Sequence, residues 1–572
     1  QDLTITERDQ PERVQLFRHA LLQEVAYQSL LYARRRELHR RIGDYLQRRY
    51  ADSLDTYYGL LAHHYRLSDQ RTIALPFLLL AGHAALHEYA NDDAIQYYRW
   101  AEEIIYDPTN ATRYAGDPRR WELHNALGDA LSTVGRYDEA LAQYGAILAA
   151  EPPAPVAVRA EAYRDRGSAL EKQGSYADAL TELTSAEELC RSNLDDVPPL
   201  LLSEVSADMG LVLMRRGEYD LALGICSEGL NMLRRDTRSR EDERIEARLH
   251  GLLGQNYGTR GDYPTARHHF GSALAAQEAI DDLAGMSKSH NNIGYLWQLQ
   301  GEYGRALEHY HFAGEHARTI NLRYMLIFVG VNTAYANYHL SDYAAAEREC
   351  REALEICRSI NDQRNTAQIE EVLGLIAYCQ GRYDEALAHY AITRGIHSAA
   401  GSLYPEANTL IYEAHVQSAL GDHGAALALT RRALATAEEL GAQQLKLEAL
   451  NAIAEAYLVA GEPTTAAGYA GEATMLAATL GSKFDRAVAE RLLGESAESG
   501  AEEHLEVSIA LFSEIRQRFE LARSQAAYAR LLARKGNYSA VHTYGVQAQE
   551  TFVAIGAQGE LARLAPFIER SV

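Results

Sequence analysis

One short phrase, Gly-x-Tyr-x-x-Ala, recurs along the chain and constrains its fold more than any other feature. Clear copies begin at Gly135, Gly174, Gly217, Gly261, Gly301 and Gly381, and weaker copies begin at Ser341, Gly421, Gly461 and Gly536. From Gly261 to Gly461 the step is 40 residues every time. A fixed period of this size indicates stacked units, because one such unit cannot bury its apolar face without a neighbour.

Each repeat reads as two helices joined by the phrase. A second marker, a small residue in the first helix, stands seven positions before the turn, at Gly128, Gly167, Gly210, Gly254, Gly294, Gly374, Ala334, Ala414 and Ala454. A small residue lets the second helix approach closely. The turn glycine can adopt the left-handed conformation that ends a helix, and the tyrosine ring then packs over the turn. We therefore predict an all-α solenoid of about eleven helical hairpins.

The segments outside the regular array divide the chain into four expected parts. These are a helical linker (1–53), a helical amino-terminal cap with a degenerate first repeat at Asn91–Ala94 (54–118), the superhelix (119–540) and carboxy-terminal capping helices (541–572). Within the first part we expect a polar tail over 1–12, a short strand at Val14–Phe17 and a helix from near His19. A blurred turn near Gly500 predicts a compressed repeat.

Composition excludes several classes of function. The formal net charge is −23, whereas nucleic-acid binding needs surplus Lys and Arg. The five cysteines form no CxxC pair, so neither a zinc site nor a disulfide framework is expected. No apolar run is long enough to span a membrane, and no signal peptide is present, which predicts a cytoplasmic location. Because the chain begins at Gln1, we expect a fragment of a longer protein.

A search for catalytic residues gives no candidate. The sequence has no HExxH motif, no Gly-x-Ser-x-Gly elbow and no glycine-rich phosphate loop. The histidine pairs His63–His64, His268–His269 and His309–His311 are adjacent or alternate along helices, so their side chains point in different directions. We expect no enzyme activity, no metal and no cofactor.

The small residue, the Gly-x-Tyr-x-x-Ala turn and the helix pair resemble the tetratricopeptide repeat (TPR) over roughly residues 85–560. The period exceeds the usual 34 residues, and the six extra residues add about 9 Å of helix. Long repeats of this kind resemble those of kinesin light chain, of LGN-type adaptors and of MalT-like bacterial regulators. The resemblance implies a right-handed superhelix in which the first helix of each repeat lines the concave face.

The same resemblance places a set of central residues on that concave face. They are Tyr295, Gln298, Phe328, Val331, Tyr335, Tyr338, Gln368, Glu371, Leu375, Tyr378, Asn408, Ile411 and His415. Asn292 and Asn332 stand where asparagines of the kinesin light chain and LGN type hold a peptide backbone, since an amide offers both a donor and an acceptor. The strip is aromatic, which suits a binding surface. The alternative is that these tyrosines pack between adjacent first helices.

The amino-terminal stretch resembles the segment that follows the ATPase module in bacterial STAND-type signalling proteins. The residues that carry this likeness are LFRHALLQEVAYQSLLYARRRELHRRIGDYL. The likeness implies that residues 1–53 are a winged-helix tail and that an ATPase domain precedes them. Leu31, Leu38, Ile42 and Tyr45 are expected to share an apolar helix face. The other face is basic and is either solvated or an interdomain docking surface; its residues include Arg34, Arg35, Arg36, Arg40 and Arg41.

Three hypotheses of function follow. The first is a non-catalytic sensor arm of a STAND-type ATPase regulator that binds a protein, a peptide or a small effector on its concave face. The second is a free-standing adaptor for extended peptides. The third is a small-molecule receptor array of the MalT type. None of them involves direct contact with nucleic acid or a membrane.

Overall fold

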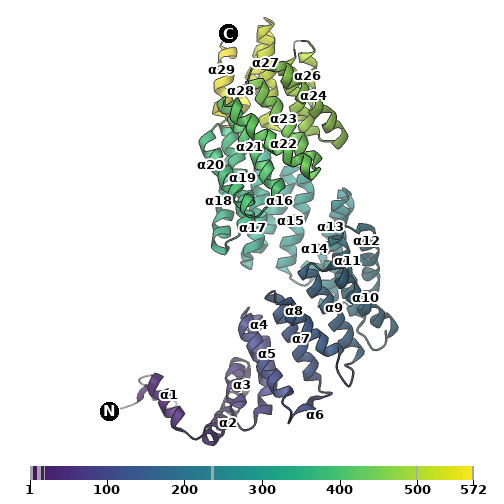
Figure 1. Ribbon diagram of the computed structural model, residues 1–572, viewed down its shortest axis with the longest axis vertical. Coiled ribbons are helices and arrows are strands. Elements are labelled where there is room, and N and C mark those ends of the chain that lie inside the picture. Colours follow the sequence, from purple (N-terminus) through teal and green to yellow (C-terminus); the bar gives the residue numbers. More distant parts are fainter. Residues whose placement is uncertain (1–3, 9–13, 18–19, 234–237, 498, 570–572) are drawn as a thin grey trace. The chain divides into compact units, whose positions relative to one another are not determined.

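The protein is described by a computed structural model that covers residues 4–8, 14–17, 20–233, 238–497 and 499–569. Its described part is almost entirely helical, as expected (Figure 1). The chain forms two compact units, unit 1 (Gln1–Asn256) and unit 2 (Tyr257–Val572). Within each unit, successive helices pack as hairpins that stack in sequence order, which is the right-handed α-solenoid predicted from the repeat.

Unit 1 begins with a small antiparallel sheet. Strand β1 (Thr4–Arg8) pairs with β2 (Val14–Phe17), with Thr4 opposite Phe17. The prediction of a short strand at 14–17 is confirmed, but the prediction of a polar tail over 1–12 was wrong because residues 4–8 are the pairing partner. Helix α1 (Ala20–Ser29) follows, and the expected start at His19 lies outside the described residues.

The remaining elements of unit 1 are helices joined by short loops. They are α2 (Tyr32–Arg49), η1 (Ala51–Tyr57), α3 (Tyr58–Arg66), η2 (Arg71–Ile73), α4 (Ala74–His87), α5 (Asn91–Ile105), α6 (Ala111–Tyr114), α7 (Pro118–Thr133), α8 (Tyr137–Leu148), α9 (Val156–Gln173), α10 (Tyr176–Ser192), α11 (Pro199–Arg215), α12 (Tyr219–Met232) and α13 (Arg240–Thr259), whose last residues belong to unit 2.

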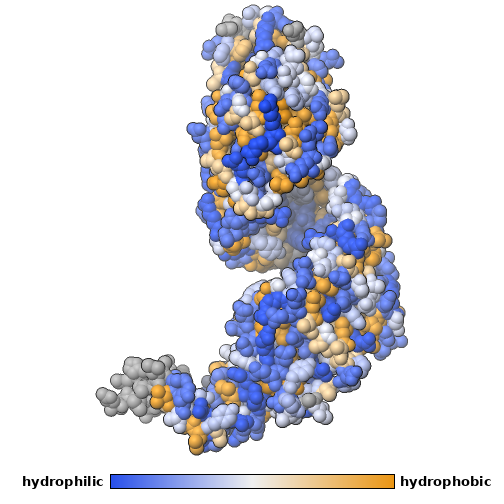
Figure 2. Space-filling view, in the orientation of Figure 1, coloured by the Kyte–Doolittle hydropathy of each residue, from blue (hydrophilic) through white to orange (hydrophobic). Residues whose placement is uncertain are grey.

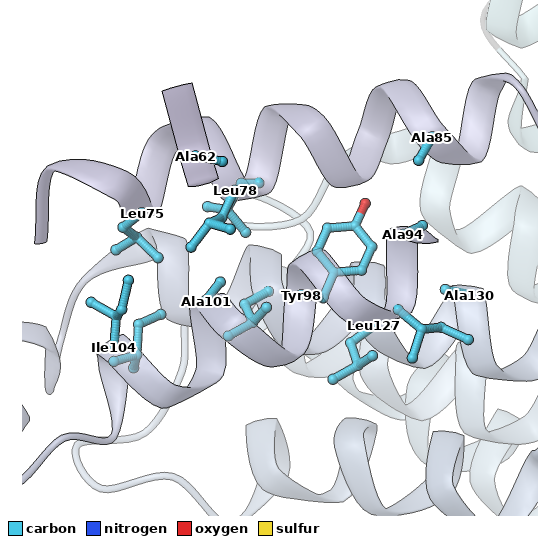
Figure 3. Close-up of a cluster of buried hydrophobic side chains, with 14 of the residues drawn as sticks. Ala62, Leu75, Leu78, Ala85, Ala94, Tyr98, Ala101, Ile104, Leu127 and Ala130 are labelled. Carbon is cyan, nitrogen blue, oxygen red and sulfur yellow. The ribbon is translucent and has the colours of Figure 1, made fainter. Parts of the chain in front are cut away.

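The pair α4/α5 is the degenerate first repeat expected at Asn91–Ala94. Tyr98 lies in a cluster of buried apolar side chains (Figure 3) and is fully buried. Its ring fills the space that a side chain on Gly82 would need. The same glycine-on-tyrosine packing recurs one hairpin later between Gly128 and Tyr144. The hairpin geometry therefore begins earlier than the clear copies of the phrase.

Unit 2 contains the most regular hairpins. Its helices are α14 (Tyr263–Ala279), α15 (Leu283–Leu299), α16 (Tyr303–Thr319), α17 (Arg323–His339), α18 (Tyr343–Ile360), α19 (Gln363–Gln380), α20 (Tyr383–Ala399), α21 (Leu403–Leu420), α22 (His423–Leu440), α23 (Gln443–Val459), α24 (Pro463–Leu480), α25 (Lys483–Ser496), α26 (Ala501–Glu514), α27 (Arg518–Arg534), α28 (Tyr538–Ile555) and α29 (Gln558–Ile568). The compressed repeat expected near Gly500 is the short pair α25/α26.

The two markers of the repeat act as their chemistry predicts. Turn glycines such as Gly301 (φ 76°) and Gly381 (φ 79°) are left-handed, a conformation that is costly for residues with a Cβ. The alanine of the phrase is fully buried, as at Ala306 and Ala386. A Cβ on the mid-helix Gly294 would lie 2.6 Å from the Tyr310 ring, so only glycine permits this helix contact.

Unit 2 closes on itself through contacts between distant hairpins. Gln517, just before α27, lies 2.9 Å (Nε2 to Nδ1) from His339 at the end of α17. Arg563 of α29 donates to the carbonyl of Ala419 in α21 over 2.6 Å. Phe519, Phe552 and Leu564 share one apolar cluster with residues of α17, α18 and α19. Distant hairpins of unit 2 therefore meet beside its concave side.

Helix α2 differs from its predicted orientation. Leu31, Ile42 and Tyr45, expected on a packed face, are 81%, 41% and 46% exposed, whereas His39 and Gly43 are buried. The reason is that the ring of Tyr65 packs on Gly43, where a Cβ would lie only 3.0 Å from the ring. Hydrophobic surface is accordingly visible on α1 and α2 (Figure 2). Among the helices of the described chain, none has the length and apolar character needed to cross a bilayer.

Candidate functional site

A cavity of about 430 Å³ lies on the concave side of unit 2. Its walls come mainly from the first helices of six successive hairpins, α17, α19, α21, α23, α25 and α27. The sequence period positions them, because a step of 40 residues brings equivalent positions of neighbouring first helices to the same inner face. Leu375 of α19 and His415 of α21 are such a pair. The cavity is thus lined by equivalent positions of successive repeats.

Aromatic side chains form most of one wall. Tyr335 contacts the His339 ring with centroids 4.4 Å apart, and Tyr390 stacks on Tyr412 at 5.7 Å. Across the cavity, Tyr378 meets Phe519 edge-on at 6.4 Å. Burial raises the pKa of the Tyr335 hydroxyl although 37% of this residue is exposed, because the exposed surface lines the concave cavity and not the outer surface of the protein. These hydroxyls stay neutral and remain able to donate hydrogen bonds.

A buried network of arginines and carboxylates, here called the arginine network, forms a second wall. The Arg523 guanidinium lies 2.5 Å from Glu455, 3.0 Å from Glu520 and 3.6 Å from Glu560. Arg491 lies 3.2 Å from Glu520. Although burial opposes ionisation, Arg523 and His415 hold the pKa of Glu455 well below its usual range. Charges in this wall are therefore balanced within the protein.

Three carboxylates near another part of the cavity, here called the acidic end, are arranged differently. They are Glu371, Glu448 and Asp485. Burial, followed by repulsion from Glu448, raises the pKa of Glu371 to about 7. Burial and the Asp485 charge raise the pKa of Glu448 to about 7, against the hydrogen bond that Gln444 donates over 2.8 Å. Among the described residues, no Lys or Arg forms an ion pair with any of the three.

Two neighbouring hollows extend the cavity along the concave side. One of about 940 Å³ shares Tyr335, His339 and Gln517 with it and reaches Tyr295. The other, of about 460 Å³, shares Tyr378 and the arginine network and ends at Arg563. The continuous concave space is therefore long enough for a ligand that is larger than one side chain.

Most of the predicted concave residues surround this space. The residues that line it are Tyr295, Gln298, Val331, Asn332, Tyr335, Tyr338, Leu375, Tyr378, Ile411 and His415. Glu371 stands one helical turn before Leu375 on the same face, and Asn408 donates to the Tyr412 hydroxyl over 3.0 Å. Phe328 is 44% exposed. The predicted residues that do not belong to the lining of the cavity or of the two hollows are Asn292, Phe328, Gln368, Glu371 and Asn408, so the structure does not bring the whole predicted strip together.

Sequence reasoning missed the contributions of the last hairpins. Phe484, Arg491, Phe519 and Arg523 all line the cavity. The expected strip covers only the central repeats and ends at His415, so it also omits the lining residues of α23. The blurred turn near Gly500 further hides the register of α25 and α27. Arginines at inward-facing positions of first helices were the signal that could have found them. The turn residue Tyr343 also lines the cavity, although its ring was expected only to pack over its turn.

The predicted docking arginines of α2 are mostly engaged within the chain. Arg34 pairs with Glu37 at 2.5 Å, and Arg40 lies 3.4 Å from Asp44. Arg35 and Arg36 donate to the carbonyls of Leu30 and Ser68 over 3.0 and 3.4 Å, respectively. Arg41 is exposed. The described residues contain no group of three or more His, Cys, Asp or Glu side chains arranged to hold a metal ion.

Two segments, residues 113–193 and 331–391, match family models that are described as tetratricopeptide repeat. The chain contains tetratricopeptide repeats. The two TPR segments lie in unit 1 and unit 2, respectively, and the second contributes Tyr335, Tyr338 and Tyr378 to the cavity. The expectation of tetratricopeptide repeats is confirmed by these two matches.

Similar proteins include a response regulator aspartate phosphatase J of Bacillus subtilis (strain 168), 33% identical over 145 residues. The match covers 24% of this TPR chain and 37% of that protein, so the chain spans about a third of the relative's length. Among solved structures, a Rap protein complexed with competence and sporulation factor is 16% identical, with a TM-score of 0.48 over 62% of this chain and 99% of that one. The apo form of RapI is 15% identical, with a TM-score of 0.40 over 50% and 99%.

Proposed function

We propose that the protein is a non-catalytic cytoplasmic sensor whose unit 2 binds a short peptide or a small effector in its concave cavity. The observation that carries the proposal is the cavity of about 430 Å³, walled by six first helices and rich in aromatic side chains. Ligand sites are typically concave and mostly apolar, with a few polar groups that fix orientation. The relative's printed name, a regulator phosphatase, is compatible with a signalling role.

Two chemical libraries test this proposal on the full chain. A mixture of synthetic pentapeptides and a mixture of metabolites are each passed through affinity selection, and retained compounds are identified by mass spectrometry. Leu375→Trp on α19 and Val488→Trp on α25 each place a large ring in the cavity. Leu440→Trp, at a position that is 44% exposed, is the matched control.

The expected result is that the wild type and Leu440→Trp retain the same compounds, whereas both cavity variants lose them with their helical circular dichroism unchanged. Retention of peptides alone favours the peptide sensor, and retention of metabolites alone favours a receptor of the MalT type. Compounds that still bind both folded cavity variants, or no retained compound from either library, would overturn the proposal.

We further propose that a STAND-type ATPase module is attached at the amino-terminal side and docks on α1 and α2. The exposed apolar residues Leu31, Ile42 and Tyr45 beside the arginines of α2 support this, because monomers rarely leave such groups clustered in water. A sensor shifts its partner only if the ligand binds the two states of the assembly unequally. The coding sequence upstream of residue 1 is the test: a GxxxxGK[ST] motif supports the proposal, and an initiator methionine close to residue 1 contradicts it.

A further inference from the structure

The two walls of the cavity differ in how their charges are balanced. In the arginine network each carboxylate has a cationic neighbour from the chain, as Glu455 and Glu520 have in Arg523. Glu371 and Glu448, at the acidic end, form no ion pair with a Lys or Arg among the residues that the structure describes, and the charge of His415 only opposes the rise in the pKa of Glu448. A buried carboxylate without a partner is costly, and natural proteins pair such groups or bind a cation with them. The acidic end therefore lacks the Lys or Arg that would balance its carboxylates.

Glu448 belongs to the lining of the cavity, whereas Glu371 lies on the same helix as residues of that lining. Glu448 lines the cavity from α23, one helical turn before Asn451. Glu371 lies on α19 one turn before Leu375 and two turns before Tyr378, which both line it. Burial raises the pKa of the Tyr412 hydroxyl, and the charges of Glu371 and Glu448 add to the shift. The two carboxylates thus face a common region beside an aromatic ring.

Apart from His415, whose charge lowers the pKa of Glu448, the other groups that face this region do not supply a positive charge. Asp485 of α25 adds a further carboxylate, and Gln444 shares its amide between Glu448 and Asp485 over 2.8 and 2.9 Å. Tyr335 and Tyr412 contribute neutral hydroxyls and electron-rich ring faces. His415 is the nearest basic group from α21, and its ring is held 2.5 Å from Glu455.

We propose that the cavity selects ligands that carry a guanidinium or ammonium group, which Glu371 and Glu448 receive between the rings of Tyr335 and Tyr412. This inference rests on the proposed function and names the chemistry of its ligand. Carboxylates bind such cations through charge-assisted hydrogen bonds, and tyrosine faces attract them through the ring quadrupole. An arginine or lysine side chain of a short peptide fits this description, as does a free polyamine.

A pair of isosteric probes tests the charge requirement on the full chain. N-acetyl-argininamide carries a guanidinium, and N-acetyl-citrullinamide replaces it with a neutral urea of the same shape. Dissociation constants are measured by isothermal titration calorimetry for the wild type, for Glu371→Gln combined with Glu448→Gln, and for Glu438→Gln combined with Glu439→Gln. The last pair removes the same two charges from exposed positions of α22.

The wild type and the α22 control are expected to bind the arginine probe at least about tenfold more tightly than the citrulline probe. The Glu371→Gln and Glu448→Gln protein should lose this preference. The affinity of the wild type for the arginine probe should also rise from about pH 6 to about pH 8, since both carboxylates ionise in this range.

Equal binding of the two probes, a preference that persists in the cavity double variant, or no binding of the arginine probe would each overturn the inference. These failures are separable from failure of the proposed function. Neutral pentapeptides that are retained by the wild type and lost in Leu375→Trp and Val488→Trp would keep the sensor proposal and reject the cationic ligand.

Discussion

A Cβ atom on Gly381 would lie 2.8 Å from the backbone nitrogen of Gly559, although 178 positions separate the two glycines. Gly381 is the left-handed turn residue between α19 and α20, and Gly559 lies in the first turn of α29. The two backbones meet without intervening side chains. This contact, here called the seal, joins the turn between α19 and α20 to α29, the last helix of unit 2.

Gly381→Ala should destabilise unit 2 more than the same change at another turn. Both Gly381 and Gly461 have φ near 79°, so alanine brings a similar backbone strain of about 1–2 kcal/mol at either site. Of these two glycines, only Gly381 has a neighbour within 4 Å of the added carbon. We expect an additional loss of about 1–3 kcal/mol from overpacking. Hydrogen exchange of α29 should accelerate in Gly381→Ala and not in Gly461→Ala; equal exchange would contradict the seal.

Gly294→Ala tests the close packing inside one hairpin. The added carbon would lie 2.6 Å from the Tyr310 ring, whereas at Gly304 it would meet nothing within 4 Å. We expect Gly294→Ala to lower the free energy of unfolding by about 1–3 kcal/mol. Gly304→Ala should leave it unchanged or raise it by about 0.5–1 kcal/mol, because alanine favours the helix. Urea denaturation measures both, and a neutral Gly294→Ala would mean that Tyr310 moves aside freely.

Arg523→Met should be among the most damaging single changes in unit 2. The substitution leaves Glu455, Glu520 and Glu560 without their shared cation, at a cost of about 3–5 kcal/mol. Lys483→Met removes an ion pair with Glu514 in which both side chains are more than half exposed, and should cost less than about 1 kcal/mol. Denaturant midpoints compare the two proteins. Similar midpoints for the two variants would show that the arginine network contributes little to the stability of the fold.

The acidic end predicts a pH dependence of stability. The pKa of Glu371 and that of Glu448 lie near 7 in the folded chain, above the ordinary value of 4.5. The folded state therefore binds more protons than the unfolded state between these values, and stability falls as the pH rises through this window. Replacing both residues by glutamine should remove about 1–3 kcal/mol of this decline, because cavity water screens part of the full shift.

Thermal or urea unfolding at about pH 5 and about pH 8 measures the effect as a difference between the double variant and the wild type. The exposed pair Glu438→Gln and Glu439→Gln serves as the control for loss of net charge. A wild type and a cavity variant with parallel pH profiles would show that the two carboxyl groups titrate normally.

Local chemistry made much of the fold predictable from the sequence. The turn glycine and the buried alanine, as at Gly381 and Ala386, depend only on backbone conformation and on the helix that follows. The same register predicted that Tyr335, Tyr338 and Tyr378 face inward, and all three line the cavity. Their role as a binding surface stays a prediction.

The opposite wall could not be predicted for a physical reason. Small rotations between successive hairpins add up over many repeats, and their sum decides whether α27 meets α17 and α19. No single residue encodes that sum, so the meeting of Phe519 with Tyr378 had no local signal. At the amino terminus the failure was local: the apolar spacing of Leu31 and Ile42 suggested a packed face, but Gly43 supplied the closer contact.

The seal between Gly381 and Gly559 also restricts how a chain of this kind can evolve. An open solenoid tolerates the gain or loss of a hairpin, because each unit contacts only its neighbours. In unit 2, an added or deleted hairpin between α20 and α28 would carry α29 away from its partner turn. Gene duplication, the usual source of new repeats, is therefore disfavoured across this stretch, and the number of repeats becomes a fixed property.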